Sequence, residues 1–102
     1  MNKFKALFAP LTLIALSGCA TMGSDFQFQG PDTIVNGKTT KAEVKKRYGN
    51  PFRVGYENGD EKWTYGYYQF KVFGASENKD LAITFNKKGV VSSYSYSTTE
   101  VN

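Results

Sequence analysis

The sequence contains no histidine and only one cysteine, and both scarcities restrict the chemistry open to the protein. Histidine is the commonest general base and the commonest metal ligand, so its absence argues against serine triads, Cys–His pairs and zinc sites. A lone cysteine cannot form a disulfide within the chain, so packing must stabilise the fold. We therefore expect a protein that is not an enzyme and that holds no metal ion.

A pair of carboxylates is the catalytic arrangement that this composition still allows, and Asp60-Glu61 is the place to look for it. These two acids follow Gly59 in a polar segment, where such a pattern usually marks a turn. A double substitution that leaves the phenotype unchanged would end the catalytic hypothesis.

Long apolar runs are also scarce, since Ala6–Leu16 is the only one and is shorter than the about 20 residues that span a bilayer. Lys3 and Lys5 precede this run and Leu16–Cys19 ends it, which is the pattern of a lipoprotein signal peptide with a lipobox. In such a motif the thiol of Cys19 accepts a diacylglyceryl group, and an acyl chain then caps the new amino terminus. The alternative is a secreted protein with an unpaired cysteine.

The lipobox predicts the domain organisation and the location of the mature protein. Residues 1–18 are expected to be the signal peptide, 19–30 a lipidated flexible tether and 31–102 one small αβ domain. Two or three acyl chains hold a protein on a membrane durably, whereas a single chain does so only marginally. Ala20 provides no acidic retention signal, which favours the periplasmic face of the outer membrane. We expect no cofactor beyond these covalent lipids.

The predicted tether is made of small and polar residues and shows no helical period. Phe26 and Phe28 are the two aromatic residues within it. We expect their rings to rest on the folded domain or on the lipid surface.

Positive charge is modest, because Lys3 and Lys5, which contribute to the formal net charge of +4, belong to the predicted signal peptide. One basic cluster remains and consists of Lys41, Lys45, Lys46 and Arg47. It is not accompanied by a nucleic-acid-binding motif, so we interpret it as the solvated face of a helix and expect no nucleic-acid partner.

The clearest local signal in the domain is the start of that helix. Thr40 to Glu43 has the pattern of a capping box, in which the threonine hydroxyl and the glutamate carboxylate each accept from a backbone N–H of the first turn. Gly49 suits the end of the helix, and Pro51 prevents its continuation. A further short helical turn is predicted over Pro31–Val35.

After Pro51 the periodicity becomes that of strands. Strands are predicted over Phe52–Tyr56, Glu61–Val72, Leu81–Phe85 and Val90–Ser97, with hairpin turns at 57–60 and 86–89. The aromatic residues of the second strand change face at the Tyr67–Tyr68 step. Either a β-bulge lies at that step or both faces of the strand are partly covered. The predicted fold is α+β, with one or two short N-terminal helices packed on a three- to four-stranded antiparallel meander.

In this order and spacing, the motifs resemble those of the SmpA/OmlA (BamE-like) family of small outer-membrane lipoproteins. The residues that carry the resemblance are the helix start Gly37–Val44, the helix end Tyr48–Pro51, the Trp63–Tyr65 segment and the final hairpin Leu81–Val91. Lys38 departs from the family pattern, which often has methionine there, and the loop after the aromatic strand has its own composition. These departures concern the partner more than the fold.

The resemblance implies an accessory scaffold on the periplasmic side of the outer membrane. Members of the family act in outer-membrane protein assembly and envelope integrity by contacting partner lipoproteins and, in the best-known case, phosphatidylglycerol. The resemblance therefore implies an envelope protein partner such as the β-barrel assembly machine, together with an anionic phospholipid. The same topology is also similar to one half of the β-lactamase-inhibitor proteins. An alternative function is therefore a lipid-anchored periplasmic inhibitor or immunity module.

The aromatic strand and its exit contain more large rings than one core face needs, and such rings are typical of interfaces. The alternative is a thin core that simply uses large side chains. Our candidate contacts with a partner or lipid are Tyr68, Phe70 and Phe73, and Arg53 and Lys71 are candidate partners for a lipid head-group.

Overall fold

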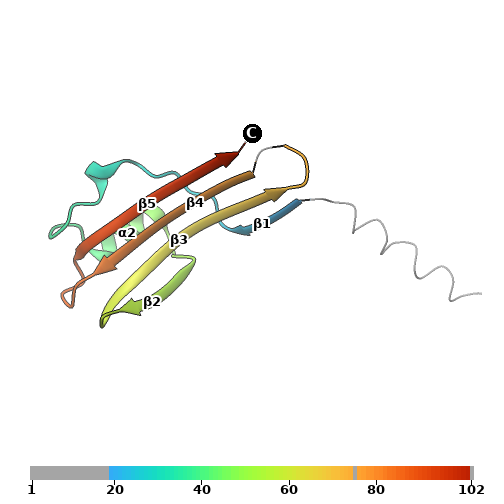
Figure 1. Cartoon of the computed structure of the whole chain (residues 1–102). Helices are drawn as coiled ribbons and strands as arrows, with labels where there is room; N and C mark the ends of the chain where they lie inside the picture. The colour runs from blue at the N-terminus through green and yellow to red at the C-terminus, as the bar shows by residue number, and fades with distance from the viewer. Residues whose placement is uncertain (1–18, 75, 102) are drawn as a thin grey trace, which may run out of the picture.

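The computed structural model describes residues 19–74 and 76–101, which form one antiparallel sheet with a helix against one face (Figure 1). The strands are β1 (Cys19–Gly23), β2 (Arg53–Glu57), β3 (Asp60–Lys71), β4 (Ser76–Phe85) and β5 (Val91–Val101). The helical segments are the 3-10 turn η2 (Pro31–Thr33) and the α-helix α2 (Lys41–Tyr48). The predicted signal peptide lies outside the described residues. The predicted α+β class is confirmed, although the sheet has five strands rather than three or four.

The additional strand is β1, which comes from the segment that the sequence predicts as a flexible tether. The strands β1 and β2 share one edge of β3, where β2 pairs with residues 60–64 and β1 pairs with residues 67–71. Because β2 is short, half of this edge would otherwise present unpaired N–H and C=O groups, and β1 satisfies them. The sequence of β1 does not alternate, so periodicity could not reveal this strand.

Helix α2 begins and ends where the sequence predicts. The hydroxyl of Thr40 accepts from the N–H of Glu43, and the Glu43 carboxylate accepts from the N–H of Thr40, so the capping box is complete. At the other end the N–H of Gly49 donates to the carbonyl of Lys45. These local bonds satisfy backbone groups that a short helix cannot satisfy internally.

The core lies between α2 and the face of the sheet that carries Trp63 and Tyr65 (the inner face). Its buried members are Ile34, Val44, Trp63, Tyr65, Leu81, Ile83, Phe85 and Val91. Phe26 and Phe28 pack against this cluster, and the Phe28 ring stacks on Tyr96 with centroids 4.3 Å apart. Of the two expected positions for these rings, the domain and the lipid surface, the structure shows the domain, and the rings extend the core beyond the short helix.

The predicted β-bulge at Tyr67–Tyr68 is wrong, because β3 and β4 pair in continuous register from Glu61 with Phe85 to Gln69 with Glu77. The irregularity lies instead between β4 and β5, at Thr84 and Phe85. The aromatic residues change face because both faces of β3 are partly covered, which was the other sequence interpretation. Strand alternation then places Tyr68 and Phe70 on the face turned away from α2 (the outer face).

The hairpin between β2 and β3 turns at Asn58 and Gly59, which have φ angles of 54° and 84°. Two successive positive φ values are characteristic of the tight turn that the Asn-Gly pair predicts. Asp60 is the first residue of β3 and Glu61 follows it within the strand. The two carboxylates therefore point to opposite faces of the sheet, which does not suit a catalytic pair.

The sheet has two distinct ends. Cys19 pairs with Lys71 at the end where β3 turns into β4, whereas β2 pairs with the first residues of β3 at the opposite end. Figure 1 shows β1 and the β3–β4 turn together at one end, and α2 and β2 together at the other. The twelve residues of β3 separate these ends by about 36 Å at the usual rise of a strand.

Candidate functional site

The outer face of the sheet exposes an apolar cluster close to β1. The register places Met22 beside Tyr68 and Ala20 beside Phe70, so that β1 and β3 contribute to the same surface. Met22 is 60% exposed and Phe70 is 63% exposed. A shallow groove of about 270 Å³ runs between them and is lined by Ala20, Thr21, Met22, Tyr68, Gln69, Phe70, Ser76 and Asn78. This Met22–Phe70 cluster is the candidate interaction surface.

Tyr68 is fixed at the edge of the Met22–Phe70 cluster and is half-buried. Its hydroxyl donates to Asp80 Oδ2 at 2.6 Å, and its ring meets Phe52 edge to face with centroids 6.3 Å apart. The ring also lies over Gly66, where a Cβ atom would come within 2.7 Å of it. The hydrogen bond to Asp80, followed by burial, raises the pKa of Tyr68 above its usual value of 10.0.

Arg53 extends the outer face towards β2. Its guanidinium lies 6.0 Å from the centre of the Phe52 ring, and the register sets it beside Thr64. Stacking of this kind holds a positive charge against an aromatic surface. Aromatic, methionine and arginine side chains thus follow one another along the outer face.

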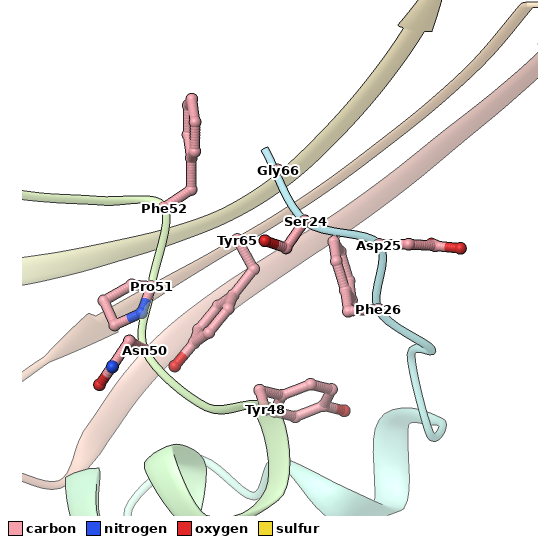
Figure 2. Close-up of a pocket in the computed structure, with 9 residues that line it drawn as sticks. All are labelled: Ser24, Asp25, Phe26, Tyr48, Asn50, Pro51, Phe52, Tyr65 and Gly66. Carbon is pink, nitrogen blue, oxygen red and sulfur yellow. The ribbon is translucent and has the colours of Figure 1, made fainter. Parts of the chain in front are cut away.

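A second hollow lies on the inner face, between the end of α2, β3 and the segment that follows β1 (Figure 2). Its volume is about 350 Å³, and it is lined by Ser24, Asp25, Phe26, Tyr48, Asn50, Pro51, Phe52, Tyr65 and Gly66. Figure 2 shows the rings of Phe26, Tyr48 and Tyr65 turned towards this hollow, while the Phe52 ring points away from them. Phe52 thereby reaches Tyr68 on the outer face.

The aromatic rings of this hollow are structural. The ring centroids of Tyr48 and Tyr65 are 5.7 Å apart, and Phe26 meets Tyr48 edge to face at 6.4 Å. The Tyr65 hydroxyl donates to the carbonyl of Gly49 at 2.8 Å, which closes the end of α2. Burial, and then the nearby Tyr48, raises the pKa of Tyr65 well above its usual range. A phenol held neutral and bonded to backbone acts as a support for the fold.

Lys79 fastens the segment after β1 to the sheet. Its Nζ atom lies 2.7 Å from Asp25 Oδ1 and 3.3 Å from Glu77 Oε1, and it also donates to the carbonyl of Phe26. The Lys79 side chain is 12% exposed, whereas that of Asp25 is 53% exposed. The hydrogen bond from Lys79 lowers the pKa of Asp25, and the same bond raises the pKa of Lys79. Residues predicted as a tether are therefore bound to the domain.

The structure separates the five residues that the sequence singles out. Tyr68, Phe70 and Arg53 lie on the outer face, while strand alternation turns Lys71 to the inner face beside Cys19. Phe73 lies in the β3–β4 turn and is 90% exposed. Sequence reasoning missed Met22 and Phe52 as contributors to the surface. The sequence shows Phe52 only as the first residue of the predicted strand 52–56, and Met22 joins the surface only through the pairing of β1.

Neither a metal site nor a membrane-spanning helix is found in the described part of the chain. Over residues 19–74 and 76–101, no group of three or more Cys, Asp and Glu side chains is placed to hold a metal ion. None of the helices in those ranges is long and apolar enough to cross a membrane.

The comparison with protein families gives one match. The model of the outer membrane protein assembly factor BamE domain matches residues 32–95. No curated protein and no solved structure that was compared matches the chain. The matched stretch runs from η2 through α2 and the hairpins into β5, and it covers more than half of the chain. The protein therefore belongs to the BamE family of outer membrane protein assembly factors.

Proposed function

We propose that this protein is a lipid-anchored accessory factor for the assembly of outer-membrane β-barrel proteins and for envelope integrity. The lipobox at Leu16–Cys19 supports the anchor, and membership of the BamE family supports the role in assembly. Lipid on Cys19 would hold the domain on the periplasmic face of the outer membrane. The protein then acts through contacts rather than through catalysis.

The observation that carries this proposal is the exposed Met22–Phe70 cluster on the outer face. Met22 and Phe70 are each more than half exposed. Neighbouring apolar side chains that stay exposed on a folded domain mark an interaction site when they form a patch. Protein interfaces are enriched in aromatic residues, methionine and arginine, and Met22, Tyr68, Phe70 and Arg53 on this face are side chains of these kinds. We propose that the cluster binds a protein of the β-barrel assembly machine, with Tyr68 as its rigid edge and Arg53 as its polar rim.

The two candidate head-group ligands cannot act on one lipid. Arg53 pairs with Thr64, seven residues before Lys71 along β3, so the two positions are about 24 Å apart along the strand. They also lie on opposite faces of the sheet. Lys71 is the one that pairs with Cys19, so we assign any contact with an anionic phospholipid to Lys71 and the protein contact to Arg53.

Crosslinking in intact envelopes tests the protein contact. A photoreactive residue in place of Phe70 should capture a subunit of the β-barrel assembly machine. The matched control carries the same residue at Ser95, which is exposed on the outer face of β5 and lies outside the apolar cluster, and it should capture much less. Equal capture at both positions would refute a specific surface. Capture of a periplasmic enzyme at Phe70 would favour the inhibitor or immunity hypothesis instead.

The anchor has its own test. Cys19→Ser should abolish the incorporation of labelled palmitate into the protein, because the thiol that accepts the diacylglyceryl group is lost. Palmitate incorporation that is equal in the Cys19→Ser protein and the wild type would refute the lipobox interpretation.

A further inference from the structure

The β3–β4 turn exposes apolar side chains that neither the core nor the Met22–Phe70 cluster uses. Val72 is 59% exposed and Phe73 is 90% exposed, and both follow the last residue of β3. Phe73 has the greatest exposure among the large hydrophobic side chains of the described residues. Exposure of so large a ring to water is unfavourable unless another molecule covers the ring.

The turn lies next to the proposed lipid attachment point. Cys19 is the first residue of β1 and pairs with Lys71, so their Cα atoms are about 5 Å apart in an antiparallel ladder. Phe73 follows Lys71 by two residues, which adds at most about 7 Å at the rise of an extended chain. The Phe73 Cα atom is therefore within about 12 Å of the Cys19 Cα atom.

We propose that Val72 and Phe73 insert into the head-group region of the bilayer beside the lipid on Cys19 and so fix the orientation of the anchored domain. This inference rests on the proposed lipidation of Cys19. An acylated Cys19 lies at the membrane surface, and the polar zone of one leaflet is only about 5 to 8 Å thick. A ring within about 12 Å of that point, at the same end of the sheet, can reach this zone without any change in the fold.

Energetic considerations favour a bilayer over a protein as the occupant. Two apolar side chains on a turn offer far less than the roughly 1,000 Å² that a specific protein interface buries. The same two side chains need no independent affinity for a membrane to which Cys19 is already attached, because the attachment makes their insertion intramolecular. Lys71 precedes them and can place its ammonium group among lipid phosphates.

Insertion of the turn would fix the orientation of the domain relative to the membrane. A lipid on Cys19 alone would let the sheet lie on the membrane or rotate about its anchor. A second point of contact at Phe73 makes the sheet stand with α2 and β2 about 36 Å further into the periplasm. The Met22–Phe70 cluster then lies just above the membrane surface, facing sideways, where the periplasmic parts of an integral membrane protein can reach it.

A depth measurement on the lipidated protein tests the inference. Once Cys19 carries its lipid, the mature chain has no other cysteine, so Phe73→Cys provides a single thiol for an environment-sensitive fluorophore. The labelled protein, produced from the full precursor, is reconstituted into phosphatidylcholine vesicles with and without a nitroxide-bearing lipid. The matched control is Tyr56→Cys, since Tyr56 is a 75% exposed ring on β2 at the opposite end of the sheet.

The expected result is a blue-shifted emission at position 73 that the nitroxide lipid quenches, and an unshifted emission at position 56 that only soluble iodide quenches. A second pair of variants keeps the native ring in place. A fluorophore at Val72→Cys should be quenched by the nitroxide lipid, and adding Phe73→Asp should abolish that quenching while the far-UV circular dichroism stays unchanged.

The outcomes separate this inference from the proposal on which it rests. If the labelled proteins float with the vesicles but iodide quenches positions 73 and 56 equally, the insertion is refuted and the anchor stands. If position 73 is shielded only in native envelopes and never by vesicle lipid, a protein covers the turn and the bilayer assignment is refuted. If none of the proteins floats, the lipid anchor fails and the inference fails with it.

Discussion

The packing of the Tyr68 ring over Gly66 predicts how a substitution at Gly66 changes the stability of the domain. Gly66→Ala would place a Cβ atom 2.7 Å from the Tyr68 ring, so the ring must leave its position. Moving the ring breaks the bond of its hydroxyl to Asp80 and the contact with Phe52. A hydrogen bond to a charged group contributes about 1.5–3 kcal/mol when buried, and partial exposure of Tyr68 reduces this. We expect Gly66→Ala to lower the free energy of unfolding by about 1–2 kcal/mol.

The dependence on Tyr68 is the decisive part of this prediction. In a Tyr68→Ala background the Cβ atom at position 66 has no ring to displace. Alanine is then favoured over glycine within a strand by about 0.5–1 kcal/mol, so Gly66→Ala should become neutral or stabilising. The double-mutant cycle should therefore show a coupling that changes the sign of the Gly66→Ala effect.

Thermal and urea unfolding of the four proteins, produced without lipid, measures this coupling. For a domain of this size a loss of 1 kcal/mol lowers Tm by about 4–8 °C. The reasoning is refuted if Gly66→Ala costs the same in both backgrounds, since the ring of Tyr68 would then not occupy the space above Gly66.

Three further predictions concern the supports of the fold. Thr40→Ala removes one half of the capping box and should cost about 1 kcal/mol, measured by urea unfolding, and an unchanged midpoint would contradict it. The Glu61 carboxylate accepts from Lys41 Nζ and from the Trp63 indole, and these bonds lower its pKa below 4.5. Their stabilisation is complete above pH 4.5 and is lost as pH falls through the lowered pKa, so Glu61→Gln should flatten the acid limb of the stability profile. Lys79→Met should speed hydrogen exchange over residues 24–28 while the exchange of α2 stays unchanged, and equal protection in both proteins would show that Lys79 does not fasten this segment.

These supports explain why a small domain with a thin core can expose apolar side chains on its outer face. Trp63 packs edge to face on Phe85 at 4.8 Å, and Phe26 and Phe28 add their rings to the inner face. The inner face therefore provides most of the burial that stabilises the fold. The outer face is left free to carry side chains such as Phe70 that are suited to contacts with other molecules.

Features of this fold that depend on residues close together in the chain are the ones that its sequence predicts. The capping box at Thr40 and the turn at Asn58-Gly59 involve residues within four positions of each other, so they can be recognised in the sequence. The alternation of Leu81, Ile83 and Phe85 also predicts their burial on one face. The family resemblance rests on these same local motifs, and the BamE domain match confirms it.

The strand β1 and the surface around it depend on pairing between distant segments, which local sequence patterns do not contain. β1 forms because Cys19–Gly23 pairs with the open edge of β3, some 50 positions further along the chain. No local preference within those five residues predicts a strand. That pairing brings Met22 to Phe70, Cys19 to Lys71 and the proposed lipid to the exposed Phe73. The lipobox, the helix and the hairpins can thus be recognised in the sequence, whereas the surface beside the proposed anchor is known only once the strands are paired. Edge pairing and side-chain coverage depend on contacts between residues that are distant in the chain, and local patterns carry no record of such contacts.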